Sequence, residues 1–235
     1  MSQQHWRPDG SLQGRTAIVT GCASVVVVDV GTAYSGYGAS EGPATESASE
    51  ICALGYKAVP DTHSVVDAQK IVDIALSSLG RVDILINGAG INRYGKLENY
   101  STADLKEILE TNTLGSLPVV NIASSSVLGT VDYTPYITSK AGLVGLTKAL
   151  AAEFDYSMNI KINAVAPISA SRMTAPALTD ERTIKNFELA RPPARNAAII
   201  LALAIDASTF NGEFFSTGGY KVHRIVFGML PGYKG

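Results

Sequence analysis

Short apolar runs rich in β-branched residues alternate along the chain with longer amphipathic stretches. Near-continuous apolar runs are typical of strands that are buried on both faces, as in parallel sheets. The pattern predicts seven strands, at residues 16–20, 25–29, 56–60, 82–86, 118–122, 160–165 and 212–216.

Helical patterns lie between these runs. In residues 65–79, Ile71, Ile74 and Ala75 share one stripe, and Ser101 followed by Asp104 is a capping-box start. We predict helices at residues 65–79, from 101 onward, at 136–154 and at 197–204, with a Gly- and Ser-rich loop at 31–45. The alternation predicts an α/β fold: a single domain over residues 1–235 with a Rossmann-like doubly wound parallel sheet, helices on both faces, and ligands at the carboxyl ends of the strands.

Two junctions are too short for this architecture. Residues 21–24 separate the first two strands, although adjacent parallel strands need a crossover of about a dozen residues. Between Ser116 and Leu117 a helix would run into a strand without a turn. The spacing indicates that segments are absent near 24/25 and 116/117, or that the chain is truncated there. A measured mass equal to that of the 235 printed residues would refute missing segments.

Composition narrows the class of protein. Hydrophobic residues make up 46% of the chain, enough to form a sizeable core. The net charge is −2 and the basic residues are scattered, so the sequence indicates no positively charged surface for nucleic acid. Two cysteines, Cys22 and Cys52, provide neither a disulfide framework nor a metal site. The polar start does not resemble a signal peptide, and no apolar run reaches the roughly 18 residues of a membrane helix. We expect a cytoplasmic enzyme for a small-molecule substrate, without nucleic-acid or membrane partners.

Tyr136 and Lys140 are spaced i, i+4 in a predicted helix, so the phenol and the ammonium lie on one face. A nearby cation favours the phenolate and lowers the tyrosine pKa from its usual value of about 10. Such a pair can transfer protons near neutral pH. Alone the pattern is weak, because most Tyr-x-x-x-Lys pairs are solvated helix surface.

Polar residues after other strands strengthen this interpretation. A hydroxyl at Ser124 could bond a carbonyl oxygen as charge develops on it, and Asn87-Gly-Ala-Gly90 would let a ligand approach the backbone. Asn112 lies inside a predicted helix, where asparagine is unfavourable. Each of these residues also has an ordinary structural explanation. Ser124 could lie in a serine-rich turn, Asn87 to Gly90 could form a strand-to-helix turn, and Asn112 could be a surface asparagine.

Together these residues resemble the short-chain dehydrogenase/reductase family over nearly the whole chain. The matching pieces run in the family's order: Thr20-Gly21, Asp29, Asn87 to Gly90, Asn112, Ser124, Tyr136 with Lys140, and Asn163-Ala-Val-Ala-Pro167. A closer resemblance, to the (3R)-hydroxyacyl-CoA dehydrogenase units of peroxisomal multifunctional enzyme type 2, rests on the long loop 31–45, on Ser171-Arg-Met-Thr174 and on the final segment from Gly212.

The resemblance implies a site and a reaction. Tyr136 would be the general acid and base, Lys140 would lower its pKa and bind the nicotinamide ribose, Ser124 would orient the substrate oxygen, and Asn112 would hold a proton-relay water. No metal is implied. The residues implied to contact the cofactor are Gly21, Asp29, Asp61, Asn87, Gly88, Ala89, Lys140, Pro167 and Thr174.

The implied activity is the NAD-dependent interconversion of a secondary alcohol and a ketone. The substrate would be a 3-hydroxyacyl thioester or another hydrophobic hydroxy compound. A homodimer or homotetramer would form through helix 136–154, whose small residues permit close helix packing. These are Ala141, Gly142, Gly145, Ala149 and Ala151.

Asp29 favours NAD over NADP as the cofactor. A carboxylate at the end of the second strand accepts hydrogen bonds from an adenosine ribose and repels a 2′-phosphate, and no arginine follows it closely. A strand-end aspartate can also simply cap its own turn.

Departures from the family pattern keep alternatives open. Of the glycine-rich phosphate turn only Gly21 remains, Val25 stands where the next glycine should be, and the helix that would hold the pyrophosphate is absent. Ser124 precedes Tyr136 by 12 positions, one fewer than is usual in the family, which leaves Ser125 as a fallback.

A non-catalytic NAD-binding or scaffold relative is the main alternative. A third hypothesis is that the protein is an epimerase or a dehydratase. His63, isolated beside Ser64, resembles a helix cap more than a ligand.

Overall fold

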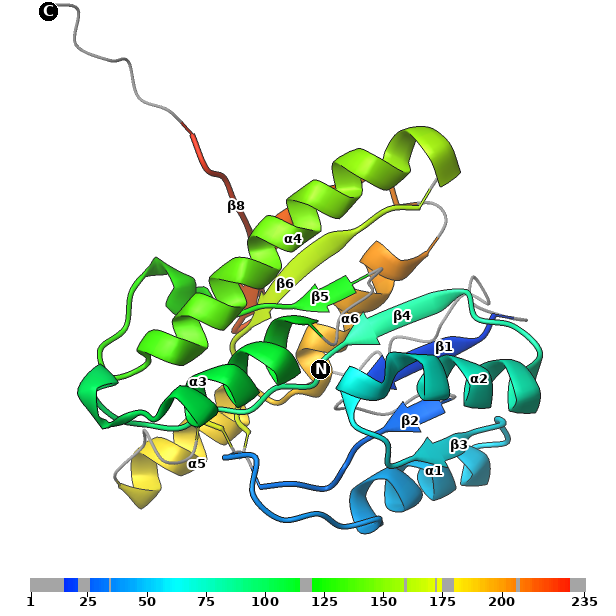
Figure 1. The fold of residues 1–235 in the computed structure, drawn as a ribbon, viewed down its shortest axis with the longest axis horizontal. Helices are drawn as coiled ribbons and strands as arrows, with labels where there is room; N and C mark the ends of the chain where they lie inside the picture. Colours follow the sequence, from blue (N-terminus) through cyan, green and yellow to red (C-terminus); the bar gives the residue numbers. More distant parts are fainter. Residues whose placement is uncertain are drawn as a thin grey trace, which may run out of the picture.

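A computed structural model describes residues 15–20, 26–33, 35–114, 120–158, 160–171, 173–174, 180–205 and 208–228. Within these ranges one eight-stranded sheet runs in the order β3-β2-β1-β4-β5-β6-β7-β8 (Figure 1). All neighbouring strands are parallel except β8, which pairs antiparallel with β7. The strands are β1 Ala17–Thr20, β2 Val26–Val28, β3 Val59–Asp61, β4 Ile84–Asn87, β5 Val120–Ile122, β6 Asn163–Pro167, β7 Phe214–Gly218 and β8 Lys221–Ile225.

Helices cover both faces of this sheet. α2 and α4 pack on one face, with α3 beside α4, while α1 and α6 pack on the other (Figure 1). The α-helices are α1 Gly42–Ala53, α2 Ala68–Leu79, α3 Thr102–Leu109, α4 Thr134–Met158, α5 Glu181–Ala190 and α6 Ala194–Ala204. Shorter turns are the 3₁₀ helices η1 Val65–Asp67, η2 Leu97–Asn99 and η4 Ser125–Leu128, and the π-helix η3 Glu110–Leu114.

Strand β2 shows why its sequence is apolar throughout. Val26 and Val28 pack with Ile71 of α2, whereas Val27 packs with Ala44 of α1 on the opposite face. Successive side chains of a strand point to opposite faces, so a strand covered on both sides must be apolar at every position. The predicted α/β fold class, a doubly wound parallel sheet, is confirmed.

Several elements differ from the sequence prediction. α1 begins at Gly42, inside the predicted loop 31–45, because Pro43 occupies the first turn, where its missing N–H costs nothing. β3 begins at Val59 rather than at residue 56. The prediction missed α5, whose helical residues are all partly or fully exposed, and β8, whose residues are also largely exposed.

Strands β1 and β2 are direct parallel neighbours, with Ile18 opposite Val26. Residues 21–25 and 115–119, which contain the two junctions, lie outside the described residues. The predicted absence of segments near 24/25 and 116/117 therefore stays a prediction.

Candidate active site

The carboxyl ends of β4, β5 and β6 meet beside α4 around a cavity of about 200 Å³. Ligands of open parallel sheets bind at this edge because the loops there leave a crevice. We call this space the catalytic cavity. Its lining residues are Gly88, Gly90, Asn92, Ile122, Ala123, Ser124, Ser126, Tyr133, Tyr136, Lys140, Pro167, Ser169, Ser171, Met173 and Thr174.

Tyr136 and Lys140 both face the catalytic cavity from the first half of α4, as their spacing predicts. Lys140 is 3% exposed, and its Nζ donates a hydrogen bond of 2.9 Å to the carbonyl oxygen of Ile122. A side chain at Gly90 would crowd this ammonium, because a Cβ there would lie 3.3 Å from Nζ. The glycine thus lets the chain pass close to Lys140.

The pKa values of this pair are set mainly by burial. Burial raises the pKa of Tyr136, and the Ser124 hydroxyl acts in the opposite direction. Burial lowers the pKa of Lys140 to about 8. The predicted lowering of the Tyr136 pKa by Lys140 is not found in this geometry. The Lys140 Nζ lies 5.9 Å from the centre of the Tyr136 ring and is bonded to Ile122 instead.

Ser124 ends the segment after β5 and caps the short helix η4. Its Oγ accepts a hydrogen bond of 3.2 Å from the Ser126 amide and lies 2.8 Å from the Ser126 hydroxyl. Both serines line the catalytic cavity, while the fallback Ser125 does not. Of the two, the Ser124 hydroxyl is the one that acts on the pKa of Tyr136.

Asn112 sits where α3 widens into the π-helix η3. Its Oδ1 accepts from the Ile91 amide at 2.8 Å, and its Nδ2 donates to the Ile91 carbonyl and to the Ser139 hydroxyl at 3.0 and 2.9 Å. The side chain is fully engaged, so it fixes the strand-end segment relative to α4. A widened turn of this kind often marks a functional site.

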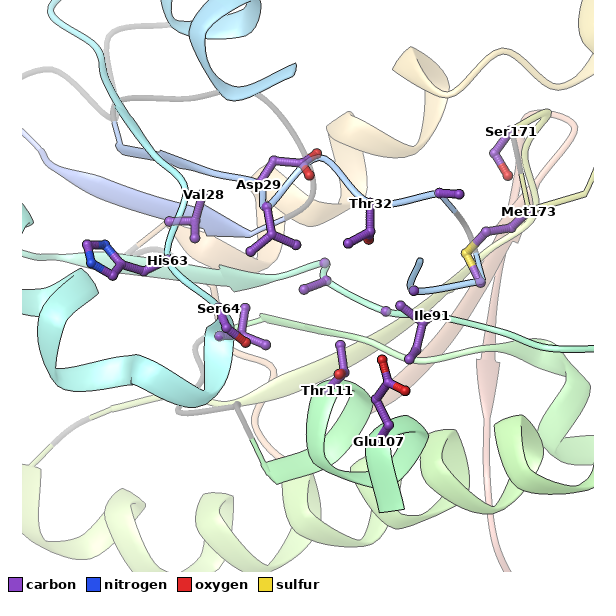
Figure 2. Close-up of a pocket in the computed structure, with 17 residues that line it drawn as sticks. Val28, Asp29, Thr32, His63, Ser64, Ile91, Glu107, Thr111, Ser171 and Met173 are labelled. Atoms are coloured by element: carbon purple, nitrogen blue, oxygen red, sulfur yellow. The ribbon is translucent and has the colours of Figure 1, made fainter. Parts of the chain in front are cut away.

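A second cavity, of about 350 Å³, continues from the catalytic cavity along the ends of β2, β3 and β4 (Figure 2). The two share Gly88, Gly90, Ser171 and Met173. In Figure 2 Met173 lies at one end and His63 at the other. We call it the nucleotide cavity. Its lining residues are Val28, Asp29, Val30, Thr32, Ala33, Gly36, His63, Ser64, Val65, Gly88, Ala89, Gly90, Ile91, Glu107, Thr111, Ser171 and Met173.

Two aspartates lie at the ends of neighbouring strands beside the nucleotide cavity, although Asp61 is not among the residues that line it. Asp29 lines it, and one of its oxygens accepts a hydrogen bond of 2.7 Å from the Gly31 amide, so it also caps its own turn. Asp61, 3% exposed, accepts from the amide of His63 at 2.9 Å and lies 2.7 Å from its ring nitrogen. The second oxygen of Asp61 is buried without a hydrogen-bond partner in the described residues.

The other predicted contacts lie along the same edge. Gly88 and Ala89 line the nucleotide cavity, and Pro167 and Thr174 the catalytic cavity. Asn87 instead turns into the sheet, with its Nδ2 3.3 Å from Asn121 Oδ1. Gly21 lies outside the described residues.

Several residues at the two cavities, or packed directly behind them, were not predicted from the sequence. Tyr94 donates a hydrogen bond from its hydroxyl to the Met173 carbonyl and packs edge-on against Tyr133, with 4.8 Å between ring centres. Asn92 is buried in the catalytic cavity, and His63 lies beside Asp61 rather than capping a helix, a role that Ser64 takes. Their loops, rather than a motif, bring these residues together, so no sequence signal marks them.

The described part of the chain contains no group of three or more His, Cys, Asp or Glu residues that could hold a metal ion. Among the described residues, no helix is long and apolar enough to cross a membrane.

A family model described as enoyl-(acyl carrier protein) reductase matches residues 23–214. Among curated relatives, peroxisomal multifunctional enzyme type 2 of Drosophila melanogaster is 31% identical over 92% of this chain and 42% of its own length. A short-chain type dehydrogenase/reductase of Mycobacterium tuberculosis is 33% identical over 87% of this chain and 76% of its own. The chain spans less than half of the first curated relatives it matches.

Solved structures agree on the fold. A short-chain dehydrogenase from Mycobacterium avium superposes with a TM-score of 0.76 at 24% identity, over 96% of this chain and 89% of that one. With matches of the family model and of relatives over most of the chain, this protein belongs to the short-chain dehydrogenase/reductase family, a family of oxidoreductases that includes dehydrogenases acting on CH–OH groups.

Proposed function

We propose that the chain is an NAD-dependent oxidoreductase that interconverts a secondary alcohol and a ketone, with Tyr136 as the group that transfers the proton. One observation carries the proposal: Tyr136, Lys140 and Ser124 line a single cavity that adjoins a second one at the ends of β2, β3 and β4. A substrate and a dinucleotide could therefore meet beside the phenol.

In ketone reduction the Tyr136 hydroxyl would give its proton to the carbonyl oxygen, and in alcohol oxidation the phenolate would take the proton back. The raised pKa of Tyr136 keeps it a phenol at neutral pH, ready to donate. The Ser124 hydroxyl would donate a second hydrogen bond to the same oxygen as negative charge develops there. A bound nicotinamide would supply or accept the hydride at the reacting carbon.

The residues present fit the adenosine half of such a cofactor. The unpaired oxygen of Asp61 would accept from the base, and the oxygen of Asp29 that does not bond Gly31 would accept from the ribose. Asp29 also favours NAD, because a second negative charge on the ribose would meet its carboxylate. Lys140 would bond the ribose near the reacting centre, and Ala89, Pro167 and Thr174 would line the nicotinamide end.

The substrate class is proposed from the named relatives. Peroxisomal multifunctional enzymes and a (2S)-[(R)-hydroxy(phenyl)methyl]succinyl-CoA dehydrogenase suggest a 3-hydroxyacyl thioester, and a D-threitol dehydrogenase suggests a smaller hydroxy compound. We expect a homodimer or homotetramer in a cytoplasmic or peroxisomal setting.

The test is Tyr136→Phe. The ring is kept and the transferable proton is lost, so we expect kcat to fall by about 10²–10⁴ on any alcohol that the wild type oxidises. Tyr56→Phe, the same change on an exposed ring that lines neither cavity, is the control and should retain full activity. A Tyr136→Phe enzyme with near wild-type turnover would end the assignment.

The short link between β1 and β2 favours a second candidate, a relative that binds NAD without turning it over. Calorimetric titration with NAD separates the two. Saturable binding without turnover on a panel of secondary alcohols would support the second candidate, and binding with turnover the first.

A further inference from the structure

Asn92 is a buried amide in the wall of the catalytic cavity. It follows Gly90 and Ile91 after β4 and is 1% exposed. It lines the cavity together with Ser124, Tyr133 and Tyr136. Its side-chain oxygen, Oδ1, has no hydrogen-bond partner among the described residues.

The neighbouring buried asparagines have partners, although Nε of the adjacent Arg93 is also buried without one among the described residues. Asn112 uses both ends of its amide, and Asn121 donates to the Thr147 hydroxyl at 2.8 Å and accepts from Asn87 at 3.3 Å. A buried acceptor without a partner costs about 1–3 kcal/mol, and folded proteins contain few of them. Such groups concentrate at sites where a ligand provides the missing partner.

We propose that Asn92 Oδ1 accepts a hydrogen bond from a second polar group of the substrate, an O–H or N–H donor beyond the reacting carbinol. Asn92 would then be a specificity-determining residue: it selects hydroxy compounds that carry such a donor over those that are apolar beside the reacting carbon. The inference rests on the proposed function, because it takes the catalytic cavity as the substrate site. A site built to bond a polar group discriminates strongly against an analogue that lacks it, since the protein atom is then left unpaired.

Two matched pairs of ketones identify the donor. Acetoin against butan-2-one adds a hydroxyl group next to the carbonyl. The acetoacetyl thioester of N-acetylcysteamine against that of a plain alkyl thiol adds an amide N–H in the arm. In each pair the quantity compared is the ratio of kcat/KM values for reduction with NADH. If substitution of residue 92 changes the ratio for one pair, the donor that Asn92 binds is the group that distinguishes the two ketones of that pair.

The variant is Asn92→Leu, which keeps the size of the side chain and removes the acceptor. We expect it to reduce the ratio for one pair by about 10- to 100-fold. The matched control is Asn99→Leu, the same change at an exposed position in the same loop, which should leave both ratios unaltered. Ratios unchanged in Asn92→Leu for both pairs would overturn the proposal.

Two measurements without turnover separate this role from others. Because Oδ1 has no protein partner to lose, Asn92→Leu should unfold at the same or a higher temperature than the wild type. A fall of several degrees, with equal losses on both members of each pair, would show a structural role. Weaker NADH binding with unaltered ratios would assign Asn92 to the cofactor. Either outcome refutes the proposal.

If the protein does not reduce any of the ketones, the change in its unfolding temperature when each ketone is added still tests the proposal. Stabilisation of the wild type by the donor-bearing member, reduced in Asn92→Leu, would support the role of Asn92 even if the catalytic assignment failed. Equal stabilisation of both proteins would refute it.

Discussion

At the residue scale, burial acts in opposite directions on the two members of the proton-transfer pair. Tyr136 loses part of its tendency to ionise, whereas Lys140 loses part of its tendency to hold a proton. Desolvation disfavours the charged form of each group, so the same environment shifts both groups toward their neutral forms. A cation brought closer to the phenol, or a bound ribose, would change this balance.

Lys140→Met tests the cost of the buried ammonium. Below pH 8 Lys140 is protonated both folded and unfolded, and the folded state bears the desolvation cost. Between about 8 and 10.5 the folded protein releases the proton first, so the cost fades as pH rises. We expect the variant to be inactive yet about 2 kcal/mol more stable at pH 7, with the difference shrinking at pH 10. Urea unfolding at the two pH values measures this, and a less stable variant at pH 7 would contradict it.

Asp29→Ser tests the choice of nucleotide. Removing the carboxylate removes the repulsion toward a 2′-phosphate and one ribose acceptor, so the ratio of kcat/KM for NAD over NADP should fall at least about tenfold. Asp73→Ser, on the exposed side of α2, is the matched control and should leave the ratio unaltered. An unaltered ratio in Asp29→Ser would mean that its carboxylate serves only the Gly31 turn.

Residues carried by regular elements could be placed from sequence, and residues carried by loops could not. Tyr136 and Lys140 share a helix face, and Ser124 and Asp29 follow strands, so periodicity and topology place them at one edge. Asn92 lines the site, and Tyr94 packs against Tyr133 behind it, only because of the path of an irregular segment after β4. Nothing in their spacing specifies that path.

At the scale of elements, the π-helix η3 positions the end of α3 against α4. The extra residue in its turn brings Asn112 to the segment after β4, where it bonds both backbone groups of Ile91. Sequence reasoning identified Asn112 as unusual in a helix, but the widened turn has no sequence signature. α1, α5 and β8 were missed for a related reason: their side chains are small or largely exposed, so they lack the apolar stripe that marks a packed element.

We therefore expect Asn112→Ala to lower both the free energy of unfolding and kcat. The Ile91 amide and carbonyl would lose their partner in a buried environment, for which we expect a loss of about 3 kcal/mol in the free energy of unfolding. We also expect a lower kcat, because the segment from Gly90 to Asn92 lines the catalytic cavity. Asn99→Ala is the control for both measurements. Stability within about 0.5 kcal/mol of the wild type would contradict the role of these bonds.

At the scale of the molecule, the chain is shorter than the proteins it resembles within the matched region. The alignment with the Drosophila relative spans 255 positions, more than the 235 residues of the chain, although it covers 92% of that chain. The relative thus has residues that this chain lacks. This agrees with the short junctions at 24/25 and 116/117, for which an intact-mass measurement remains the decisive test.

Assembly is predicted from the outer face of α4, where Ala141, Gly142, Gly145 and Ala149 are exposed. Small residues let two helices approach closely, so we expect a dimer or tetramer at micromolar concentration. Gly145→Arg should shift the chain to monomer, because a side chain there meets nothing within 4 Å in the monomer. Ser77→Arg on α2 is the control, and sedimentation velocity is the measurement. A wild-type protein that is wholly monomeric would refute the assembly.

Strand β8 closes one side of the sheet, and in the described part of the chain no further strand pairs with its outer edge. Open edges can add strands from other molecules, and natural proteins discourage this with charged side chains. Lys221, His223 and Arg224 lie in this strand, and Glu213, the residue before β7, pairs with Arg224. At neutral pH, like charge on Lys221 opposes edge-to-edge contact between two copies. Salt screens such repulsion, so concentrated salt, rather than heat alone, is the condition under which this edge would promote aggregation.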